Sequence, residues 1–196
     1  MQFQKTVLKR RMVRHFSKDP IPDRDLNKIL ELAQHYPSAG FSQGVAYVIV
    51  KEPTARKKIG HLQGEEEYVS SGFHSFISEA PVVIVVSVSE QVYHKRYQEP
   101  DKLQAGEKEI PWPTPYWFFD AGAASMIILL AAVDLGYAAG FAGVSDLQGL
   151  RDLLKIPAEF HPVGTISIGK RLPDKKSESL KRGRRSSREV VHFEHW

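Results

Sequence analysis

Apolar residues recur at helical spacing in several parts of the chain, and each recurrence predicts a helix. A turn at residues 20–23 begins one such helix, which ends before Pro37 because the residue ahead of a proline is pushed out of helical geometry. The apolar positions of that helix are Leu26, Ile29, Leu30 and Ala33. Residues 116–136 form a longer helix that is apolar nearly all round, which predicts a central place in the fold.

Three further helices are predicted from weaker signals. Residues 6–14 are typical of a short basic helix, and Thr54 is a candidate cap for a helix that reaches toward Gly72. The segment Ser145-Asp146-Leu147-Gln148 matches a capping box. The apolar stripe of the helix that follows is Leu147, Leu150 and Leu154.

Short runs of β-branched residues predict strands at residues 45–50, 81–88 and 162–168. The middle run is continuously apolar, as in a strand that is buried on both faces. Residues 89–115 are polar, proline-rich and irregular, which predicts a long functional loop that shapes a pocket; whether it also forms a lid stays open at this point. Residues 136–143 are small and glycine-rich, which favours a tight connection.

Together these elements predict a single α+β domain over residues 1–196, with a mostly buried sheet and a long central helix. A chain of 196 residues can bury a sizeable core. No run of about 18 uncharged apolar residues occurs, and residues 121–133 are too few to span a bilayer. The charged N-terminus has no apolar signal core, so we expect a cytoplasmic protein with no membrane contact.

Basic residues gather near the C-terminus. Residues 170–188 hold nine Lys or Arg against two acids, a local charge of +7, so the rest of the +4 chain carries −3. This distribution predicts a local anion site or a solvated basic tail over residues 170–196, and it argues against a nucleic-acid surface spread over the fold.

The chain offers little for metal or thiol chemistry. It has no cysteine, which excludes disulfides, thiolate metal sites and cysteine nucleophiles. Six histidines show no spacing typical of metal ligands, and we expect no metal. These are His61, His74, His94, His161, His192 and His195.

Three segments, in order, carry a family resemblance. The first, Arg10-Arg11-Met12-Val13-Arg14-His15-Phe16, is similar to the Arg-Arg-Ser-x-Arg-x-Phe opening of FMN-dependent nitroreductases. Tyr36-Pro37-Ser38-Ala39-Gly40-Phe41-Ser42-Gln43 resembles their Ala-Pro-Ser-x-x-Asn-x-Gln-Pro-Trp turn, and Asp120-Ala121-Gly122-Ala123-Ala124 with Leu135-Gly136 resembles their central helix. The chain departs from the pattern at Met12, at Phe41 where the family often has a flavin-binding Asn, and at Gly44-Val45 in place of Pro-Trp.

The resemblance implies a nitroreductase-like fold, with a central, mostly antiparallel sheet surrounded by helices. It implies a homodimer that holds FMN at the subunit interface, with the C-terminal tail extending onto the partner subunit. The enzyme would take hydride from NAD(P)H and pass two electrons to a nitroaromatic, a quinone or a similar small acceptor. Because the flavin carries the chemistry, no protein residue is expected to be catalytic.

The resemblance also implies individual flavin contacts. Arg10 and Arg11 would lie near the phosphate and ribityl chain, and Arg14 near the pyrimidine edge of the ring. If residues 6–14 are helical, Arg10 and Arg14 share a face, which is equally the pattern of a solvated basic helix. The full set of expected cofactor contacts is Arg10, Arg11, Met12, Arg14, Pro37, Ser38, Ala39, Gly40, Gln43, Ala139, Gly140, Phe141, Arg182, Arg184 and Arg185.

Other functions stay open at this point. The turn at residues 37–40 and the segment 140–143 are also typical of ordinary connections. A non-catalytic flavin or anion-binding protein is one alternative to the enzyme. A specialised flavin-modifying or dehalogenating enzyme of the same fold is a further alternative, as is a nucleic-acid binder that uses the basic tail.

Overall fold

A four-stranded antiparallel sheet forms the centre of the computed structural model, which describes residues 2–104 and 108–196. Its strand order is β1-β2-β4-β3, and each neighbouring pair is antiparallel. The predicted strands at residues 45–50, 81–88 and 162–168 are confirmed. The observed bounds are β1 Val45–Val50, β2 Val82–Val88, β3 Ala138–Ala142 and β4 His161–Gly169.

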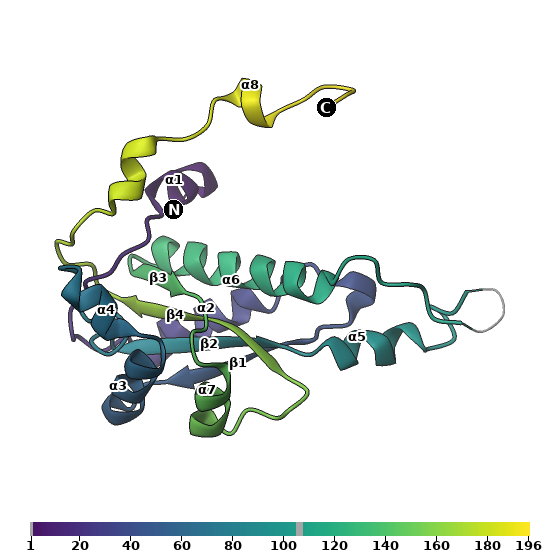
Figure 1. Ribbon diagram of the computed structural model, residues 1–196, viewed down its shortest axis with the longest axis horizontal. Helices are drawn as coiled ribbons and strands as arrows, with labels where there is room; N and C mark the ends of the chain where they lie inside the picture. The colour runs from purple at the N-terminus through teal and green to yellow at the C-terminus, as the bar shows by residue number, and fades with distance from the viewer. Residues whose placement is uncertain (1, 105–107) are drawn as a thin grey trace.

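Helices surround the sheet in the described residues, as predicted (Figure 1). The predicted helix after residue 23 and the long helix from Tyr116 are confirmed. The α-helices are α1 Phe3–Lys9, α2 Asp23–Ala33, α3 Pro53–Leu62, α4 Glu65–Ser70, α5 Glu90–Tyr97, α6 Tyr116–Asp134, α7 Leu147–Leu154 and α8 Ser187–Val190. Two 3-10 turns, η1 Ala39–Phe41 and η2 Glu178–Arg182, complete the set.

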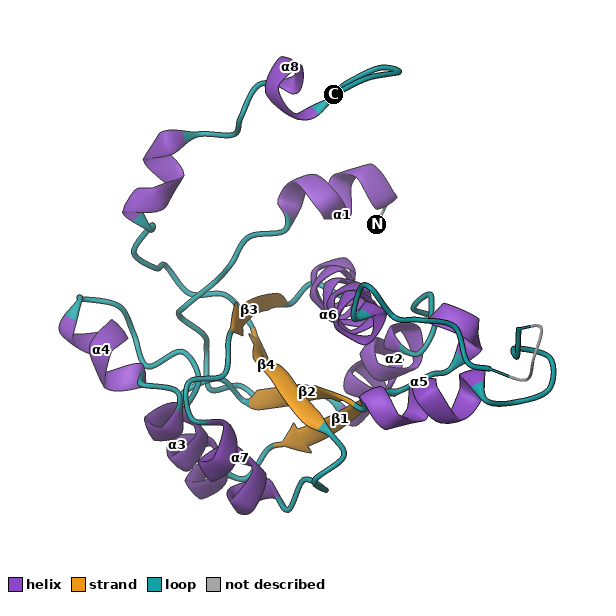
Figure 2. Cartoon of the chain, turned by 45° about the vertical axis from the view of Figure 1, so that its right-hand side comes forward, coloured by secondary structure: helices purple, strands orange, loops and turns teal. Residues whose placement is uncertain are grey.

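Strand β2 explains the layering, because it is buried along its whole length. Alternate side chains of a strand point to opposite faces of the sheet. Val82, Ile84 and Val86 pack in one core cluster with α2 and α6, whereas Val83 and Val85 pack in another with α3 and α7. The result is three layers with helices on both faces of the sheet, as Figure 2 shows.

Helix α6 packs on α2 and on all four strands. By length and composition α6 is long and apolar enough to cross a membrane. Residues 121–133, the only run considered from the sequence, are too few to suggest this. Of the most apolar stretch of the helix, 56% is buried inside the protein, as in a core helix. Part of its surface stays open in the described chain: Phe119 is 69% exposed, and Tyr116 and Met126 are exposed as well.

The predicted basic helix over residues 6–14 is wrong in its bounds. Helix α1 ends at Lys9, and residues 10–16 form an extended strap across the sheet edge. The physical reason is burial in the folded chain. The extended strap places Val13 and Phe16 in the core, where they are only 2% and 1% exposed. The expected shared helical face of Arg10 and Arg14 therefore does not exist.

Two predicted helix starts and one helix length also need correction. The single helix expected from Thr54 toward Gly72 is two helices, because Gly64 adopts a left-handed conformation (φ +68°) between α3 and α4. The side chain of Glu52, not Thr54, caps α3. Asp146, one residue after the expected Ser145, caps α7.

Two segments that were predicted to be irregular each contain a regular element. Residues 90–97 of the expected loop form α5, whose pattern is weak because Tyr93 is the one residue it buries. Residues 105–107 of that loop lie outside the described residues. The expected connection at 136–143 contains β3, in which alanine and glycine hide the usual β-branched signal.

Candidate functional site

The strap lies against strand β3. Met12 forms a parallel bridge with Ala139, and the amide of Val13 donates to the Ala139 carbonyl at 3.1 Å. A Cβ on Gly140 would lie only 2.3 Å from the Val13 carbonyl oxygen, so only glycine allows this approach. The structure thus brings two of the predicted segments, residues 10–14 and 139–141, together.

Arg14 is held between aromatic rings and the start of the tail. Its guanidinium carbon lies 6.0 Å from the ring centre of Tyr68 and 5.6 Å from that of Phe73. Cations are attracted to ring faces at such distances. The backbone amide of Arg14 donates to the Asp174 carboxylate at 3.1 Å, and Arg171 forms an ion pair with the same carboxylate at 3.0 Å.

A cavity of about 550 Å³ opens beside Arg14, since Tyr68 and Phe73 are among its walls. It lies between the α3–α4 region and the segment that follows β3. Its lining residues are Gln63, Gly64, Glu67, Tyr68, Ser71, Phe73, Ala142, Gly143, Val144 and Ser145. A Cβ built on Gly143 would meet no atom within 4 Å, so backbone is accessible there to a flat ligand.

Gln63 gives this cavity an unused polar group. The side chain is 4% exposed, and its Oε1 accepts a hydrogen bond from the Ser145 amide at 2.8 Å. Its Nε2 is buried and has no partner among the described residues. A buried donor without a partner costs about 1–3 kcal/mol, so a ligand acceptor at this point would be favoured.

The other expected contacts of the strap and β3 differ in their surroundings. Nη1 of Arg10 is buried without a partner in the described chain, whereas Nη1 of Arg11 donates to the Leu8 carbonyl at 2.5 Å. The side chain of Met12 is exposed. Ala139 and Gly140 are buried within the sheet, and Phe141 is half-buried, so the cavity is lined by the residues just after them.

The predicted turn at residues 37–43 is a tight, strained structure. Gly40, Phe41 and Gln43 all have φ between +55° and +59°, a range that non-glycine residues rarely adopt. The Ser38 hydroxyl accepts the Gln43 amide at 2.8 Å, so it serves the turn itself. Pro37 and the Phe41 side chain are exposed.

Asp120 fixes this turn to α6. Its Oδ2 accepts the Ala39 amide at 2.9 Å and the Tyr93 hydroxyl at 2.8 Å. Burial first, and then the hydrogen bond to Asp120, raise the pKa of the Tyr93 hydroxyl. Arg96 of α5 adds a hydrogen bond to the Gly40 carbonyl at 3.0 Å.

The turn and the strap lie at opposite ends of α6. The turn is bonded to Asp120 near the helix start, whereas α1, which leads into the strap, is bonded through Thr6 to Asp134 at the helix end, at 3.3 Å. Fourteen residues of α-helix separate these anchors by about 21 Å. One chain alone therefore does not bring the two predicted halves of the site together (Figure 1).

The tail arginines lie apart from both halves. Arg182, Arg184 and Arg185 are exposed, and Arg185 pairs with Glu189 of the tail itself at 3.8 Å. Figures 1 and 2 show α8 and the C-terminus standing away from the body of the chain. The structure places no predicted tail arginine beside Arg10 or Arg14.

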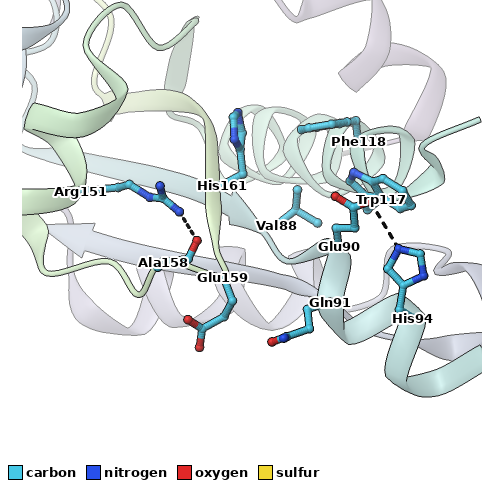
Figure 3. Close-up of a pocket in the computed structure, with 10 residues that line it drawn as sticks. All are labelled: Val88, Glu90, Gln91, His94, Trp117, Phe118, Arg151, Ala158, Glu159 and His161. Carbon is cyan, nitrogen blue, oxygen red and sulfur yellow. Dashed lines mark hydrogen bonds and ion pairs between the residues drawn. The ribbon is translucent and has the colours of Figure 1, made fainter. Parts of the chain in front are cut away.

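A second cavity of about 480 Å³ lies at the C-terminal end of β2 and the N-terminal end of β4 (Figure 3). Its walls are Val88, Glu90, Gln91, His94, Trp117, Phe118, Arg151, Ala158, Glu159 and His161. A hydrogen bond to Glu109 at 2.5 Å, together with one to Glu90 at 3.3 Å, raises the pKa of His94. The sequence pointed to only part of each cavity: the segment that ends at Gly143 in the first, and residues 90–94 of the predicted loop in the second. The remaining walls come from segments that are distant in sequence, which is why they were missed.

Comparison with known proteins agrees with this fold. The profile of the Nitroreductase family matches residues 7–170. A protein of Archaeoglobus fulgidus, named for an NADH dehydrogenase or NAD(P)H nitroreductase, is 28% identical over 98% of this chain and 97% of its own. An iodotyrosine deiodinase of Nematostella vectensis is 32% identical, but over only 35% of this chain and 26% of its own.

Solved structures share the whole architecture. An FMN-dependent nitroreductase of Clostridium difficile superposes with a TM-score of 0.73 at 20% identity, covering 98% of this chain and 99% of its own. A nitroreductase family protein of Streptococcus pneumoniae gives a TM-score of 0.76 at 19% identity, covering 98% and 100%. The predicted α+β nitroreductase-like fold is thereby confirmed.

Proposed function

Because the chain belongs to the nitroreductase family, we propose that it is an FMN-dependent oxidoreductase that takes hydride from NAD(P)H and reduces a small acceptor by two electrons. The observation that carries this proposal is the cavity beside Arg14. Its walls include the buried, unpartnered amide of Gln63 and accessible backbone at Gly143, and the Arg14 cation lies over the rings of Tyr68 and Phe73, which are also walls. The names of the Archaeoglobus and Clostridium proteins support the same activity and cofactor.

The residues on each side of the strap suit the two ends of FMN. The buried, unpartnered Nη1 of Arg10 is a donor suited to a phosphate, with Arg11 beside it on the surface. The cavity with Gln63 and Arg14 suits the flavin ring. When bound, FMN supplies a ring that accepts hydride and becomes anionic on reduction, and the Arg14 cation would favour that negative charge.

We further propose that the site is completed by a second copy of this chain. The turn at residues 37–43 is anchored on α6 about 21 Å of helix from the anchor of α1, which leads into the strap of the same chain, so the partner's strap is the one that the turn would reach. An exposed apolar stripe on α6 provides a surface for the association. Its exposed or half-buried members are Tyr116, Phe119, Ala123, Met126, Ile127 and Leu130.

The cofactor proposal is tested on the purified protein. Flavin absorbance that bleaches with NAD(P)H in the absence of oxygen supports it, whereas a colourless protein that takes up no FMN would contradict it. Arg10→Ala should weaken FMN binding roughly 10- to 150-fold, the loss of one hydrogen bond to a charged group. Arg14→Ala should lower the flavin reduction potential, with Arg14→Lys intermediate. Arg24→Ala, at a side chain that is 92% exposed, is the matched control.

The association is tested by sedimentation at low micromolar concentration. The wild-type chain should sediment as a dimer, and Phe119→Asp should shift it toward the monomer and release FMN in parallel. Val69→Asp, which changes an exposed apolar residue on α4, should do neither. A folded, flavin-bound monomer of 22.2 kDa would refute the shared site.

A further inference from the structure

Two histidines and a glutamate meet on the flank of the strap, outside both cavities. We propose that His15, His74 and Glu79 form a binding site for a divalent transition metal, with zinc as the expected ion. One ligand atom from each residue lies within 4.8 Å of the others. No other group of this kind occurs among the residues that the structure describes.

The two histidine rings are stacked, parallel within 5° and with their centres 3.4 Å apart. The lone pair of an imidazole nitrogen lies in the ring plane, so in this stack the two lone pairs run parallel and do not point at a common ion. The His74 ring would therefore turn out of the stack to bind an ion together with His15, with the two nitrogens roughly 3.3 Å apart around a tetrahedral zinc. One carboxylate oxygen of Glu79 lies within 4.8 Å of a ring nitrogen of each histidine, near enough to join them.

His15 is oriented by a second contact, as metal-binding histidines usually are. Its Nδ1 lies 2.6 Å from the Pro173 carbonyl oxygen. A carbonyl can only accept, so Nδ1 carries the proton and the lone pair of the neutral ring is on Nε2. A backbone carbonyl that fixes the ring in this way is typical of zinc-bound histidine.

The other two ligands have no competing partner. Within residues 2–104 and 108–196, no hydrogen bond or ion pair involves a ring nitrogen of His74 or the carboxylate of Glu79. Two cations of the same region are engaged elsewhere: Arg14 lies over aromatic rings, and Lys175 donates to the Ser71 carbonyl at 2.6 Å. The carboxylate therefore has no internal counter-ion among these contacts, which a metal would supply.

A bound metal would connect three segments of the chain. These are the strap, the segment 73–79 that follows α4, and the start of the tail, which is joined through Pro173. Arg14 is the neighbour of His15, so the metal would hold the strap that carries it. Three protein ligands leave one tetrahedral position for water or a small anion. The expected role is a structural clamp, and it does not depend on the proposed flavin chemistry.

The full-length protein, with whatever flavin it retains, is first treated with a chelator and then titrated with Co²⁺ as a spectroscopic probe. We expect one equivalent to bind with visible bands of tetrahedral Co²⁺, and Zn²⁺ to displace it and to raise the melting temperature. His74→Ala should weaken binding by at least 10-fold and remove the Zn²⁺-dependent rise. Glu79→Gln should weaken binding to a smaller extent.

His61→Ala is the matched control, because His61 is also exposed and near a glutamate, at 3.0 Å, but lies outside the cluster. It should leave the affinity unchanged. The proposal is overturned if Co²⁺ gives no tetrahedral bands at one equivalent. It is equally overturned if His74→Ala and wild type bind alike, because the metal would then be held elsewhere, for example by the His192 and His195 pair of the tail. Circular dichroism of each variant separates loss of the site from loss of the fold.

Discussion

Glu65 provides the sharpest test of how the wall of the first cavity is built. This carboxylate is 6% exposed and begins α4, between the cavity residues Gln63 and Tyr68. Its Oε1 accepts the Ile77 amide at 2.5 Å and the Ser78 amide at 3.1 Å, and its Oε2 accepts the Ser78 hydroxyl at 2.5 Å. The contacts fix the segment that carries Phe73 and His74 to α4.

These hydrogen bonds determine how much stability each Glu65 variant should lose. Glu65→Ala leaves two backbone donors unpaired, each at a cost of about 1–3 kcal/mol, so the free energy of unfolding should fall by roughly 2–6 kcal/mol. The Ser78 hydroxyl is left out of this sum because it can turn to the Ser75 carbonyl, 3.5 Å away. Glu65→Gln keeps one acceptor oxygen for both amides, and its new NH2 group can donate to the Ser78 hydroxyl oxygen in place of accepting from it, so this substitution should cost about 1 kcal/mol.

Urea unfolding followed by circular dichroism measures the free energy of unfolding of both variants, and the two can be compared if the dependence on urea concentration (the m-value) is unchanged. Glu66→Ala, which breaks only an exposed pair with His61, is the control and should change stability by less than about 1 kcal/mol. Equal costs for Glu65→Ala and Glu65→Gln would show that the buried acceptor does not hold the segment. A cost for Glu65→Ala as small as that of the control would refute the reasoning as a whole.

Three further outcomes are expected. Gly140→Ala should lower stability by about 1–3 kcal/mol and expose the Val13 amide to hydrogen exchange, since its Cβ would displace the strap; unchanged protection would contradict this. The pKa of His94 is raised by its hydrogen bond to Glu109, so this bond stabilises the fold fully below pH about 6.5. The stabilisation is lost as the pH rises through the raised pKa. In His94→Gln the melting temperature should therefore depend less on pH over that window. Removal of residues 189–196 should weaken both dimer and FMN retention, which sedimentation and absorbance measure together.

The elements that could be predicted are those whose burial is written into local periodicity. Helix α2 buries Leu26, Ile29 and Ala33 on one face, and β2 is buried on both. In such segments the local pattern and the tertiary contact agree, so the pattern is enough. The order of these elements, together with the family resemblance, was sufficient for the fold.

The strap and β3 could not be predicted, because each takes its form from the other. A basic segment with helical spacing becomes extended once Val13 is bonded to Ala139 and buried in the core. The small residues of β3 carry no strand signal, yet Gly140 is what lets the strap approach. Long-range contact overrides local preference in both segments.

The same reason limited the prediction of the site. Arg14 was expected near the flavin from the family pattern alone, but its aromatic neighbours Tyr68 and Phe73 are more than fifty residues away in sequence. No spacing rule connects Gln63 to Ser145, or His15 to His74. A chemically useful group of residues is visible in sequence only when its members share an element.

The features that favour a ligand and those that favour a second copy have a common energetic origin. The lone chain leaves Nη1 of Arg10 and Nε2 of Gln63 buried without partners in its described part, at about 1–3 kcal/mol each. It also leaves Phe119 on α6 and Trp196 of the tail open to water, the latter fully exposed. A domain is stable by only about 5–15 kcal/mol, so such costs are a large share of the total. Binding of an anionic cofactor would give the buried donors of Arg10 and Gln63 a partner, and a dimer interface that buries about 2,000 Å² or more would cover the exposed apolar side chains. Both would therefore raise stability together, which is why loss of the dimer and loss of FMN are expected in the same variants.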